Sequence, residues 1–346
     1  MSGGVDSSVA AALLVEQGHE VIGLSMQLYD QSGPHAFGSC CTLDDLHDAR
    51  RVAAALDFPH YIVNFEQQFH DTVVSNFVSE YAAGRTPIPC SHCNSDLKFA
   101  TLVDRARGLG AEHVATGHYA RVEQRGDARW ALKRSADPAK DQSYFLFSLT
   151  QDQLARAIFP IGALSKSDVR EQARRLGLVV ADKPDSQEIC FVPNGDYASF
   201  VAQQRPDVER GGVIVDEDGR QLGTHAGVHR FTVGQRKGLG IAAGAPMYVL
   251  KIDADAHAVT VGPREALERT SLTASGVNWI AMAQPHEWIP VRAQIRHRHT
   301  AAPGRVRALH DARAEFVFDT PQPAVTPGQA VVFYDGDEVV GGGWID

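Results

Sequence analysis

The sequence predicts an α/β protein with a parallel-sheet domain, followed by a small, mostly β central domain and a C-terminal β-barrel. Up to about residue 208, apolar strand-like runs alternate with helical stretches, which is typical of a parallel sheet. After Gly211, alternation with a period of two and glycine-rich turns take over. A chain of 346 residues exceeds the usual size of one domain. We expect domains at 1–208, 209–268 and 269–346.

The N-terminal region shows the expected alternation element by element. SVAAALLVEQG is a helix pattern that ends at Gly18, and the apolar run EVIGLSMQLY after it predicts a strand. Thr42 and Asp45 have the spacing of a capping box ahead of a helix with one apolar face. The later elements are expected, in order, as a strand at 60–65, helices at about 66–80 and 94–108, and a short strand in EHVATGHY.

The remainder of the chain reads as strands. GGVIVDEDGRQLG is a hairpin pattern with Asp218 and Gly219 at its turn. In VRAQIRHRH, apolar side chains alternate with polar ones, so Val291, Ala293 and Ile295 are expected on one face and Arg292, Gln294 and Arg296 on the other. A last hairpin pattern, AVVFYDGDEVVGGGWI, completes a tail for which a small barrel is expected.

Composition excludes several classes of protein. Charged residues make up 22% and hydrophobic residues 44%, which is ordinary for a soluble globular protein and argues against disorder. No apolar run approaches the roughly 18 residues of a membrane span, and the N-terminus lacks the pattern of a secretory signal, so we expect a cytoplasmic protein. Five cysteines, an odd and unevenly spaced set, favour reduced thiols over a disulfide framework.

The overall charge of the chain argues against a nucleic-acid partner, but the local charge of one segment is basic. The net charge is −9, whereas binding to phosphates requires clustered lysine and arginine. Residues 291–313 carry six arginines and three histidines against a single acid, Asp311. A solvated strand face is the usual explanation for such a run, and a local RNA-binding face is the alternative.

The loop SGGVDSS at Ser2–Ser8 precedes the first helix and has the composition of a phosphate site. It has no lysine, so it is not a Walker A loop, and it does not fit the G-x-G-x-x-G spacing of dinucleotide sites. Backbone N–H groups freed by Gly3 and Gly4, serine hydroxyls and the positive end of the helix suit a pyrophosphate. A plain turn with a helix cap is the competing interpretation.

Three thiols lie in two further motifs. PCSHCNSDLKF places Cys90 and Cys93 in a C-x-x-C at the start of a helix, where the helix N-terminus favours thiolate, and KPDSQEICFVP contains Cys190. A zinc site normally needs a second such pair, and the adjacent Cys40 and Cys41 are poorly placed to chelate one ion. Reactive thiols are therefore favoured over zinc.

These motifs together resemble a known family. SGGVDSS resembles the PP-loop of the ATP pyrophosphatases, whose fold is described as adenine nucleotide alpha hydrolase-like. The whole set resembles the tRNA-specific 2-thiouridylases; in chain order the motifs are SGGVDSS, GLSMQLYD, CNSDLKF, ATGHYAR, KDQSYFL, KPDSQEICF, FTVGQRKGLGI and PGQAVVFYDG. The resemblance implies that ATP with Mg²⁺ adenylates the C2 oxygen of the wobble uridine, pyrophosphate is released, and sulfur arrives from a cysteine persulfide. It also implies a persulfide donor or relay protein, and tRNAs that accept lysine, glutamate and glutamine.

The resemblance further assigns roles to residues. Cys190 would carry the persulfide and Cys93 would be the second catalytic cysteine, which either attacks that persulfide, leaving a Cys93–Cys190 disulfide, or deprotonates its outer sulfur. The implied ATP contacts are Ser2, Gly3, Gly4, Val5, Asp6, Ser7, Ser8, Met26 and Gly117. The implied tRNA contacts are His118, Lys140, Asp141, Gln142, Arg296, His297 and Gln329.

Two departures from the family leave alternatives open. Relatives have a strand that leads into the PP-loop, whereas only Met1 precedes Ser2 here, so we expect translation to start upstream. Many relatives have aspartate at the position of Cys90, and three thiols, Cys90, Cys93 and Cys190, would suit a four-iron four-sulfur cluster with one open iron. Two other functions also remain: a different PP-loop adenylating enzyme, either amidating or another RNA thiolase, and a non-catalytic RNA-binding protein.

Overall fold

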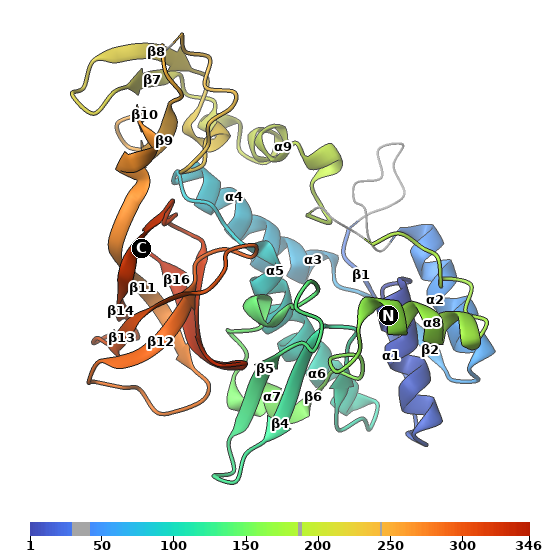
Figure 1. The fold of residues 1–346 in the computed structure, drawn as a ribbon. Helices are drawn as coiled ribbons and strands as arrows, with labels where there is room; N and C mark the ends of the chain where they lie inside the picture. Colours follow the sequence, from blue (N-terminus) through green and yellow to red (C-terminus); the bar gives the residue numbers. More distant parts are fainter. Residues whose placement is uncertain (30–41, 186–188, 243) are drawn as a thin grey trace. The chain divides into compact units, whose positions relative to one another are not determined.

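The structure, a computed structural model, describes residues 1–29, 42–185, 189–242 and 244–346 (Figure 1). The chain forms two compact units. The first comprises Met1–Val73, Cys90–Gly195 and Asp337–Val339, and the second comprises Val74–Pro89, Asp196–Gly336 and Val340–Asp346. No helix within the described residues is both long enough and apolar enough to span a membrane.

Parallel strand pairs form the sheet of the first unit. β1 (Gly23–Gln27) pairs with β2 (His60–Asn64), and β3 (Val114–Ala115) pairs with β6 (Ala157–Ile158). The sequence indicated one sheet, whereas the described residues form two separate two-stranded pieces. Met1 lies beside β1, where its amino group donates to the carbonyl of Leu24.

Helices surround these strands much as the sequence indicates. The helix α1 (Val5–Glu16) is followed by Gly18 at a φ of 82°, and α2 (Leu43–Ala55) begins with the expected capping box of Thr42 and Asp45. The other helices are α3 (Glu66–Phe69), α5 (Pro89–His92), α6 (Leu102–Gly108), α7 (Gln151–Arg156) and α8 (Lys166–Arg175). Two segments are π-helical, η1 (His70–Val74) and η2 (Cys93–Thr101), and two short turns are 3₁₀, η3 (Ser143–Phe145) and η4 (Pro193–Gly195).

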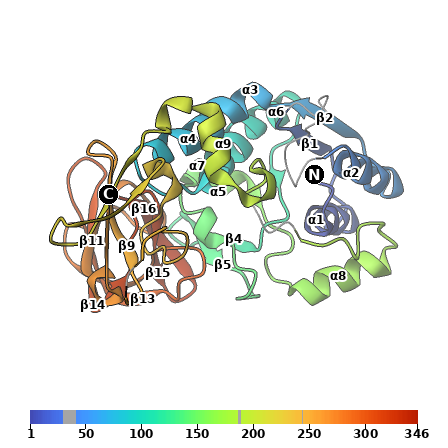
Figure 2. The same ribbon diagram turned by 90° about the horizontal axis from the view of Figure 1, so that it is seen from above.

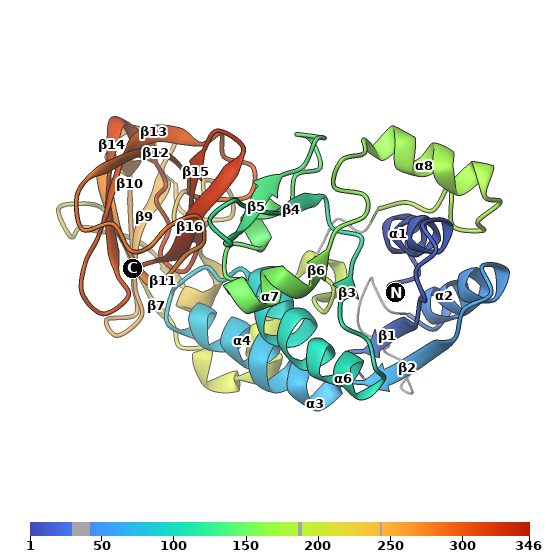
Figure 3. The same cartoon turned by 90° about the horizontal axis from the view of Figure 1, so that it is seen from below.

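The core of the first unit holds the phosphate loop in place. Val5 and Val9 of α1 are 3% and 0% exposed and share one buried cluster with Val169 and Ala173 of α8. α8 accordingly lies alongside α1 (Figure 3). The helix that follows the loop is thereby fixed by apolar packing along its length.

An antiparallel hairpin that the sequence analysis missed also belongs to this unit. β4 (Ala120–Gln124) pairs with β5 (Trp130–Arg134), and Glu338 pairs with Lys133 of β5. Arg121 also binds Asp337 at 2.6 Å. The three residues 337–339, distant in sequence, therefore complete this unit.

Two helices and a small sheet form one part of the second unit. α4 (Ser75–Ala82) packs on α9 (Tyr197–Gln204), with the rings of Tyr81 and Tyr197 stacked at 4.6 Å (Figure 2). The expected hairpin forms from β7 (Gly212–Val215) and β8 (Gln221–His225), with Gly219 in its turn at a φ of 82°. β7 also pairs in parallel with β10 (Ala258–Gly262), which pairs with β9 (Tyr248–Asp253). The 3₁₀ turns are η5 (Pro206–Val208), η6 (Val228–Arg230) and η7 (Arg264–Leu267).

A closed six-stranded barrel ends the chain, as expected. The strand order is β11-β14-β13-β12-β15-β16, and pairing of β11 with β16 closes it. Its strands are β11 (Glu268–Trp279), β12 (Ile289–Gln294), β13 (Ala302–Ala308), β14 (Ala314–Pro323), β15 (Ala330–Asp335) and β16 (Glu338–Ile345).

The alternation around β12 is confirmed with one exception. Val291, Ala293 and Ile295 are buried as expected, but Gln294 is also only 5% exposed. Its amide donates to the carbonyl oxygens of Arg296 and His297, which compensates for the loss of water. The barrel is also tied to an early segment, because the N–H of Thr86 donates to the Pro327 carbonyl at 2.9 Å.

Candidate functional site

The phosphate loop ends at a helix N-terminus whose N–H groups have no side-chain cap. Gly4 is the N-cap residue of α1 and makes no capping bond. The hydroxyls of Ser7 and Ser8 donate to the Gly4 carbonyl at 3.2 and 2.9 Å, and the Ser2 and Ser7 hydroxyls lie 3.2 Å apart. The serines therefore shape the loop and leave the first N–H groups of the helix for an anion.

Two glycines allow the close packing that fixes this loop. Gly3 has a φ of 70°, and a Cβ there would meet the carbonyl oxygen of Asp45 at 2.1 Å. A Cβ on Gly117 would lie 2.6 Å from the Asp6 carbonyl carbon and the Ser7 nitrogen. Gly117 therefore packs directly against the loop, and its assignment to ATP stays a prediction. Met26, the other residue assigned to ATP outside the loop, is half-buried in β1 in register with Val63.

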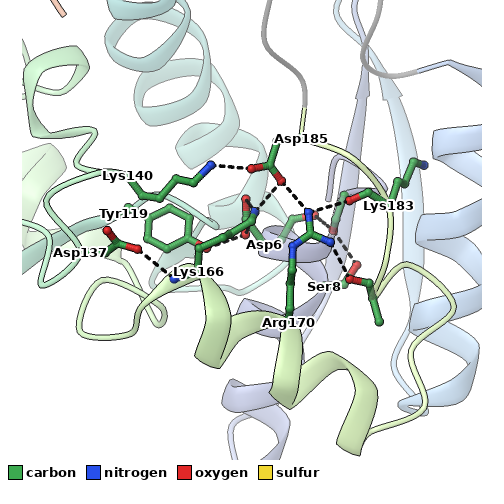
Figure 4. A network of polar contacts seen from close by, with 12 residues as sticks. Asp6, Ser8, Tyr119, Asp137, Lys140, Lys166, Arg170, Lys183 and Asp185 are labelled. Atoms are coloured by element: carbon green, nitrogen blue, oxygen red, sulfur yellow. Dashed lines mark hydrogen bonds and ion pairs between the residues drawn. The ribbon is translucent and has the colours of Figure 1, made fainter. Parts of the chain in front are cut away.

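A network of charged side chains adjoins the loop (Figure 4). Lys166, the first residue of α8, binds Asp6 of the loop at 2.8 and 2.9 Å and Asp185 at 2.8 Å. The Tyr119 hydroxyl donates to Asp6 at 2.8 Å, and burial together with Asp6 raises the pKa of Tyr119, so the hydroxyl keeps its proton. Lys166 thus brings to the loop a cation that the loop's own sequence lacks.

Asp185 gathers three cations in this network. It binds Lys140 at 2.6 Å, Lys166 at 2.8 Å and Arg170 at 3.2 Å. Burial alone would raise the pKa of Asp185, but the bonds from Lys140 and Lys166 outweigh it and lower the pKa to about 2. Asp185 is therefore charged at any physiological pH.

Lys183 makes a second link between this segment and the loop. Its ammonium donates to the Gly3 carbonyl at 3.1 Å, to Asp45 at 2.6 Å and to Asp48 at 2.7 Å. Partial burial disfavours the ammonium, but the two carboxylates raise the pKa of Lys183 overall. Sequence reasoning missed Tyr119, Lys166, Lys183 and Asp185. Two motifs offered a signal, because Tyr119 lies in ATGHYAR and Lys183 and Asp185 lie in KPDSQEIC, whereas Lys166 lies in none of the motifs.

The described thiols lie in the first unit or at its edge. Cys93 is the half-buried first residue of the π-helical segment η2, which is fixed because the Asn94 amide donates to the Phe145 carbonyl at 3.1 Å. Cys190 is also half-buried, and Cys40 and Cys41 lie outside the described residues. Solvent reaches Cys90, yet the protein packed around it raises the pKa of its thiol to about 11, with a further contribution from Cys93. The thiolate expected at the helix start is thus not favoured at Cys90.

The described residues do not fit an iron–sulfur cluster. Cys90, Cys93 and Cys190 are all free thiols. Among the described residues, no group of three or more His, Cys, Asp or Glu side chains is placed to hold a metal ion. A cluster would need three thiols brought together.

Four of the residues assigned to tRNA lie in the first unit. The ring of His118 contacts Thr116 Oγ1 at 2.7 Å and packs near Phe99 and Phe159, and desolvation lowers the pKa of His118 well below its usual value. Lys140 binds Asp185, as described above. The other two make internal bonds: Asp141 pairs with Arg134 at 2.6 Å, and the side-chain amide oxygen of Gln142 accepts from the Tyr119 N–H at 3.0 Å.

The other three assigned residues lie in the second unit, on or beside the barrel. Arg296 donates to the Pro323 carbonyl at 3.3 Å, His297 is exposed, and Gln329 donates to the Thr86 carbonyl at 3.0 Å. In the arginine-rich run, Arg307 binds Glu315 at 2.7 Å and lies 4.6 Å from the Trp288 ring. Arg298 is exposed, and no carboxylate of the described residues lies within ion-pair distance of it.

Comparison with known proteins matches every part of this chain. Residues 1–194 match a family model described as the tRNA methyl transferase HUP domain, residues 198–263 its PRC-barrel domain, and residues 269–345 an aminomethyltransferase beta-barrel domain. Proteins called tRNA-specific 2-thiouridylase MnmA match the whole chain. Those of Geotalea uraniireducens, Geobacter metallireducens and Solibacter usitatus are 56%, 54% and 54% identical, over 93%, 95% and 98% of their own lengths. The chain therefore belongs to the tRNA-specific 2-thiouridylase family.

Proposed function

We propose that this protein uses ATP to replace the C2 oxygen of the wobble uridine of tRNA with sulfur. The observation that carries the proposal is a phosphate loop with a free helix N-terminus in the same unit as Cys93 and Cys190. The loop accounts for the use of ATP, and the two thiols account for sulfur rather than another nucleophile. Relatives named for this activity match the full chain at more than half identity.

The first step would adenylate the uridine. A C2 carbonyl oxygen is a poor leaving group, and its transfer to the α-phosphate of ATP converts it into part of AMP. The N–H groups at the start of α1, beside Gly3 and Gly4, would hold the departing pyrophosphate. Magnesium supplies charge neutralisation on such phosphates and needs few protein ligands, which agrees with a loop that offers one carboxylate, Asp6.

The second step would deliver sulfur through the two cysteines. Cys190 would receive a sulfur atom from a persulfide donor or relay protein. In one route, the Cys93 thiolate attacks the Cys190 persulfide and releases sulfide, which displaces AMP from C2; the resulting Cys93–Cys190 disulfide then needs a thiol reductant. In the other route, Cys93 removes the proton from the outer sulfur, which attacks C2 and displaces AMP; the Cys93 thiolate then attacks the Cys190 sulfur of the resulting adduct, which frees the 2-thiouridine and leaves the same Cys93–Cys190 disulfide for a thiol reductant. Neither route passes through a cluster.

The proposed partner is tRNA that accepts lysine, glutamate or glutamine, in the cytoplasm. The proposed contacts are His118, Lys140, Asp141, Gln142, Arg296, His297 and Gln329. Arg298, which is exposed and has no carboxylate of the described residues within ion-pair distance, supports a basic surface on the barrel despite the net charge of −9.

The decisive experiment combines the protein with ATP, Mg²⁺, a persulfide donor and unmodified tRNA, and measures 2-thiouridine in digested nucleosides by mass spectrometry. We expect 2-thiouridine, AMP and pyrophosphate in equal amounts, and no 2-thiouridine with Cys93→Ser or Cys190→Ser. Adenylation that persists in both variants and yields an aminated product with ammonia would instead identify an amidating enzyme. Binding of tRNA without any AMP would identify a non-catalytic RNA-binding protein.

A further inference from the structure

One stretch of the small sheet in the second unit carries positive charge without any acid. Residues 219–252 contain three arginines and two lysines but no aspartate or glutamate, although the whole chain has 42 acidic residues and a net charge of −9. The stretch includes the motif FTVGQRKGLGI, to which the proposed function gives no role. An acid-free stretch of this kind gives an acidic protein a local site of positive potential.

The centre of this stretch is a loop, residues 232–240, which we call the basic loop. It is anchored in the core of the small sheet, because Phe231 and Leu239 are 4% and 7% exposed and belong to the same buried cluster. Between these two anchors, Arg236 and Lys237 are exposed. The basic loop therefore turns its charged side chains to the solvent while apolar packing holds its ends.

Hydrogen bonds fix the backbone of the basic loop. The Gly234 N–H donates to the Val249 carbonyl of β9 at 2.8 Å, and the Val249 N–H donates to the Gln235 carbonyl at 2.9 Å. The Gln235 side chain closes the turn, because it accepts from the Thr232 N–H at 3.0 Å and donates to the Lys237 carbonyl at 2.9 Å. An ordered backbone reduces the conformational entropy that is lost when a partner binds.

The charges of the basic loop are not neutralised by the parts of the chain that the structure describes. Within these parts, no carboxylate lies within ion-pair distance of Arg236 or Lys237, and neither side chain makes a hydrogen bond. Lys251 of β9, in the same acid-free stretch, is instead paired with Asp253 at 3.4 Å. The N–H donors of Arg236 and Lys237 are therefore available to an anionic partner.

The surface of the basic loop suits a polyanion better than a protein. Its exposed residues are Arg236, Lys237, Gly238 and Gly240, and none of them is an apolar or aromatic anchor of the kind on which protein interfaces are centred. The two glycines have φ values of 76° and 67°, and no atom lies within 4 Å of the Cβ position of Gly240. A sugar–phosphate backbone can therefore approach the loop closely.

We propose that the basic loop binds the ribose–phosphate backbone of tRNA, with Arg236 and Lys237 each contacting a phosphate. This inference rests on the proposed function, because it takes tRNA to be the substrate. It adds the small sheet to the tRNA-binding surface, since none of the contacts proposed above lies in that sheet. Phosphates are the same at every nucleotide, so the basic loop contributes affinity for tRNA and not the choice among tRNAs.

The first test uses the unmodified full-length protein, so it does not depend on the folding of a variant. The protein is treated with sulfo-NHS acetate, which acetylates lysines, with and without an excess of unmodified tRNA, and the modified peptides are quantified by mass spectrometry. We expect tRNA to slow the acetylation of Lys237 about fivefold or more. Lys251, whose side chain is 70% exposed, is the internal control and should react at the same rate in both samples.

The second test counts phosphate contacts from the salt dependence of tRNA binding. Arg236→Gln and Lys237→Gln each remove one positive charge, so each should reduce the slope of log Kd for tRNA against log salt concentration by about 0.7–0.9. The Kd for ATP should not change in either variant. The matched control is Lys251→Gln, which removes the same charge from the same sheet at a residue that is paired with Asp253, and it should keep the wild-type slope.

The proposal is overturned if Lys237 is acetylated equally fast with and without bound tRNA, or if both variants keep the wild-type slope. Protection of Lys237 by the persulfide donor protein but not by tRNA would also overturn it and would identify a docking site for that protein. Failure of the proposed function looks different, because the wild type would then bind tRNA with Lys237 protected but make no 2-thiouridine.

Discussion

At the level of single residues, Gly117 offers the sharpest test of the nucleotide site. A methyl group there would meet backbone atoms of Asp6 and Ser7 at 2.6 Å, which cannot swing away as a side chain can. The loop must distort to accept this methyl group, which reduces the free energy of ATP binding by about 1–3 kcal/mol. We therefore expect Gly117→Ala to weaken ATP binding about 5- to 150-fold in calorimetry. Gly126→Ala is the control, because no atom lies within 4 Å of its Cβ position. Equal ATP affinity in both variants would show that Gly117 does not belong to the nucleotide site.

Replacement of Cys90 distinguishes sulfur transfer by a Cys190 persulfide from sulfur transfer by an iron–sulfur cluster. Its thiol has a pKa of about 11 and is almost wholly protonated at neutral pH, and the described residues form no three-thiol site. We therefore expect Cys90→Ser to keep thiolation within about threefold of wild type, while Cys93→Ser loses it. The assay is 2-thiouridine formation with a persulfide donor under anaerobic conditions. If Cys90→Ser lost 2-thiouridine formation as completely as Cys93→Ser, the result would favour an iron–sulfur cluster instead.

At the level of elements, two histidines make the small sheet of the second unit sensitive to acid. His229 in η6 is fully buried and His225 ends β8, and desolvation is the main cause that lowers the pKa of both. Both stay neutral in the folded protein at a pH where the unfolded chain, with a histidine pKa of about 6.5, takes up protons. The stability present above pH 6.5 is therefore lost as the pH falls toward the folded pKa values.

We accordingly expect hydrogen exchange at β7–β10 to accelerate between about pH 7 and pH 5, after correction for intrinsic exchange rates. His229→Leu should flatten this dependence, because an apolar side chain of similar size cannot be protonated. His19→Leu, at an exposed position in the first unit, is the control. The same pH dependence in the wild type and in His229→Leu would show that His229 is not responsible.

Elements with local signals were predictable, and those with distant partners were not. The capping box of α2 and the β7–β8 hairpin rest on residues a few positions apart, so their patterns are visible in the sequence. The parallel sheet was expected only because strand-like and helix-like segments alternate along the chain. That alternation cannot show whether the two strand pairs hydrogen-bond to each other. The β4–β5 hairpin was missed, and it is completed by residues 337–339, which lie far from it in the sequence.

At the level of the whole molecule, an acidic protein is proposed to bind a polyanion through local basic surfaces. Arg298 is exposed on the barrel unit. We expect Arg298→Gln to reduce the slope of log Kd for tRNA against log salt concentration by about 0.7–0.9, the contribution of one phosphate contact. Filter binding over a salt series measures it. Arg174→Gln, on α8 in an ion pair with Asp182, should leave the slope unchanged.

The site as a whole was only partly predictable from the sequence. The loop was visible because a phosphate cradle is built from consecutive residues, Ser2–Ser8. The cations that bind the loop were not visible in the sequence, because Lys166 and Lys183 lie 160 and 180 positions from the loop residues that they contact. Nothing in the local pattern of KPDSQEIC distinguishes Lys183 from an ordinary surface lysine. Only folding brings these charges to the loop.

The interleaving of the two units has a consequence for synthesis on the ribosome. Thr86 belongs to the second unit, yet its partners Pro327 and Gln329 lie near the C-terminus. At about 5–20 residues per second, these partners are made roughly 10–50 s after Thr86. For the first part of that time the nascent helix α4 also lacks α9, so its apolar face stays uncovered until residues 197–204 are made. The newly made chain is thus expected to need protection by chaperones until its last strand leaves the ribosome.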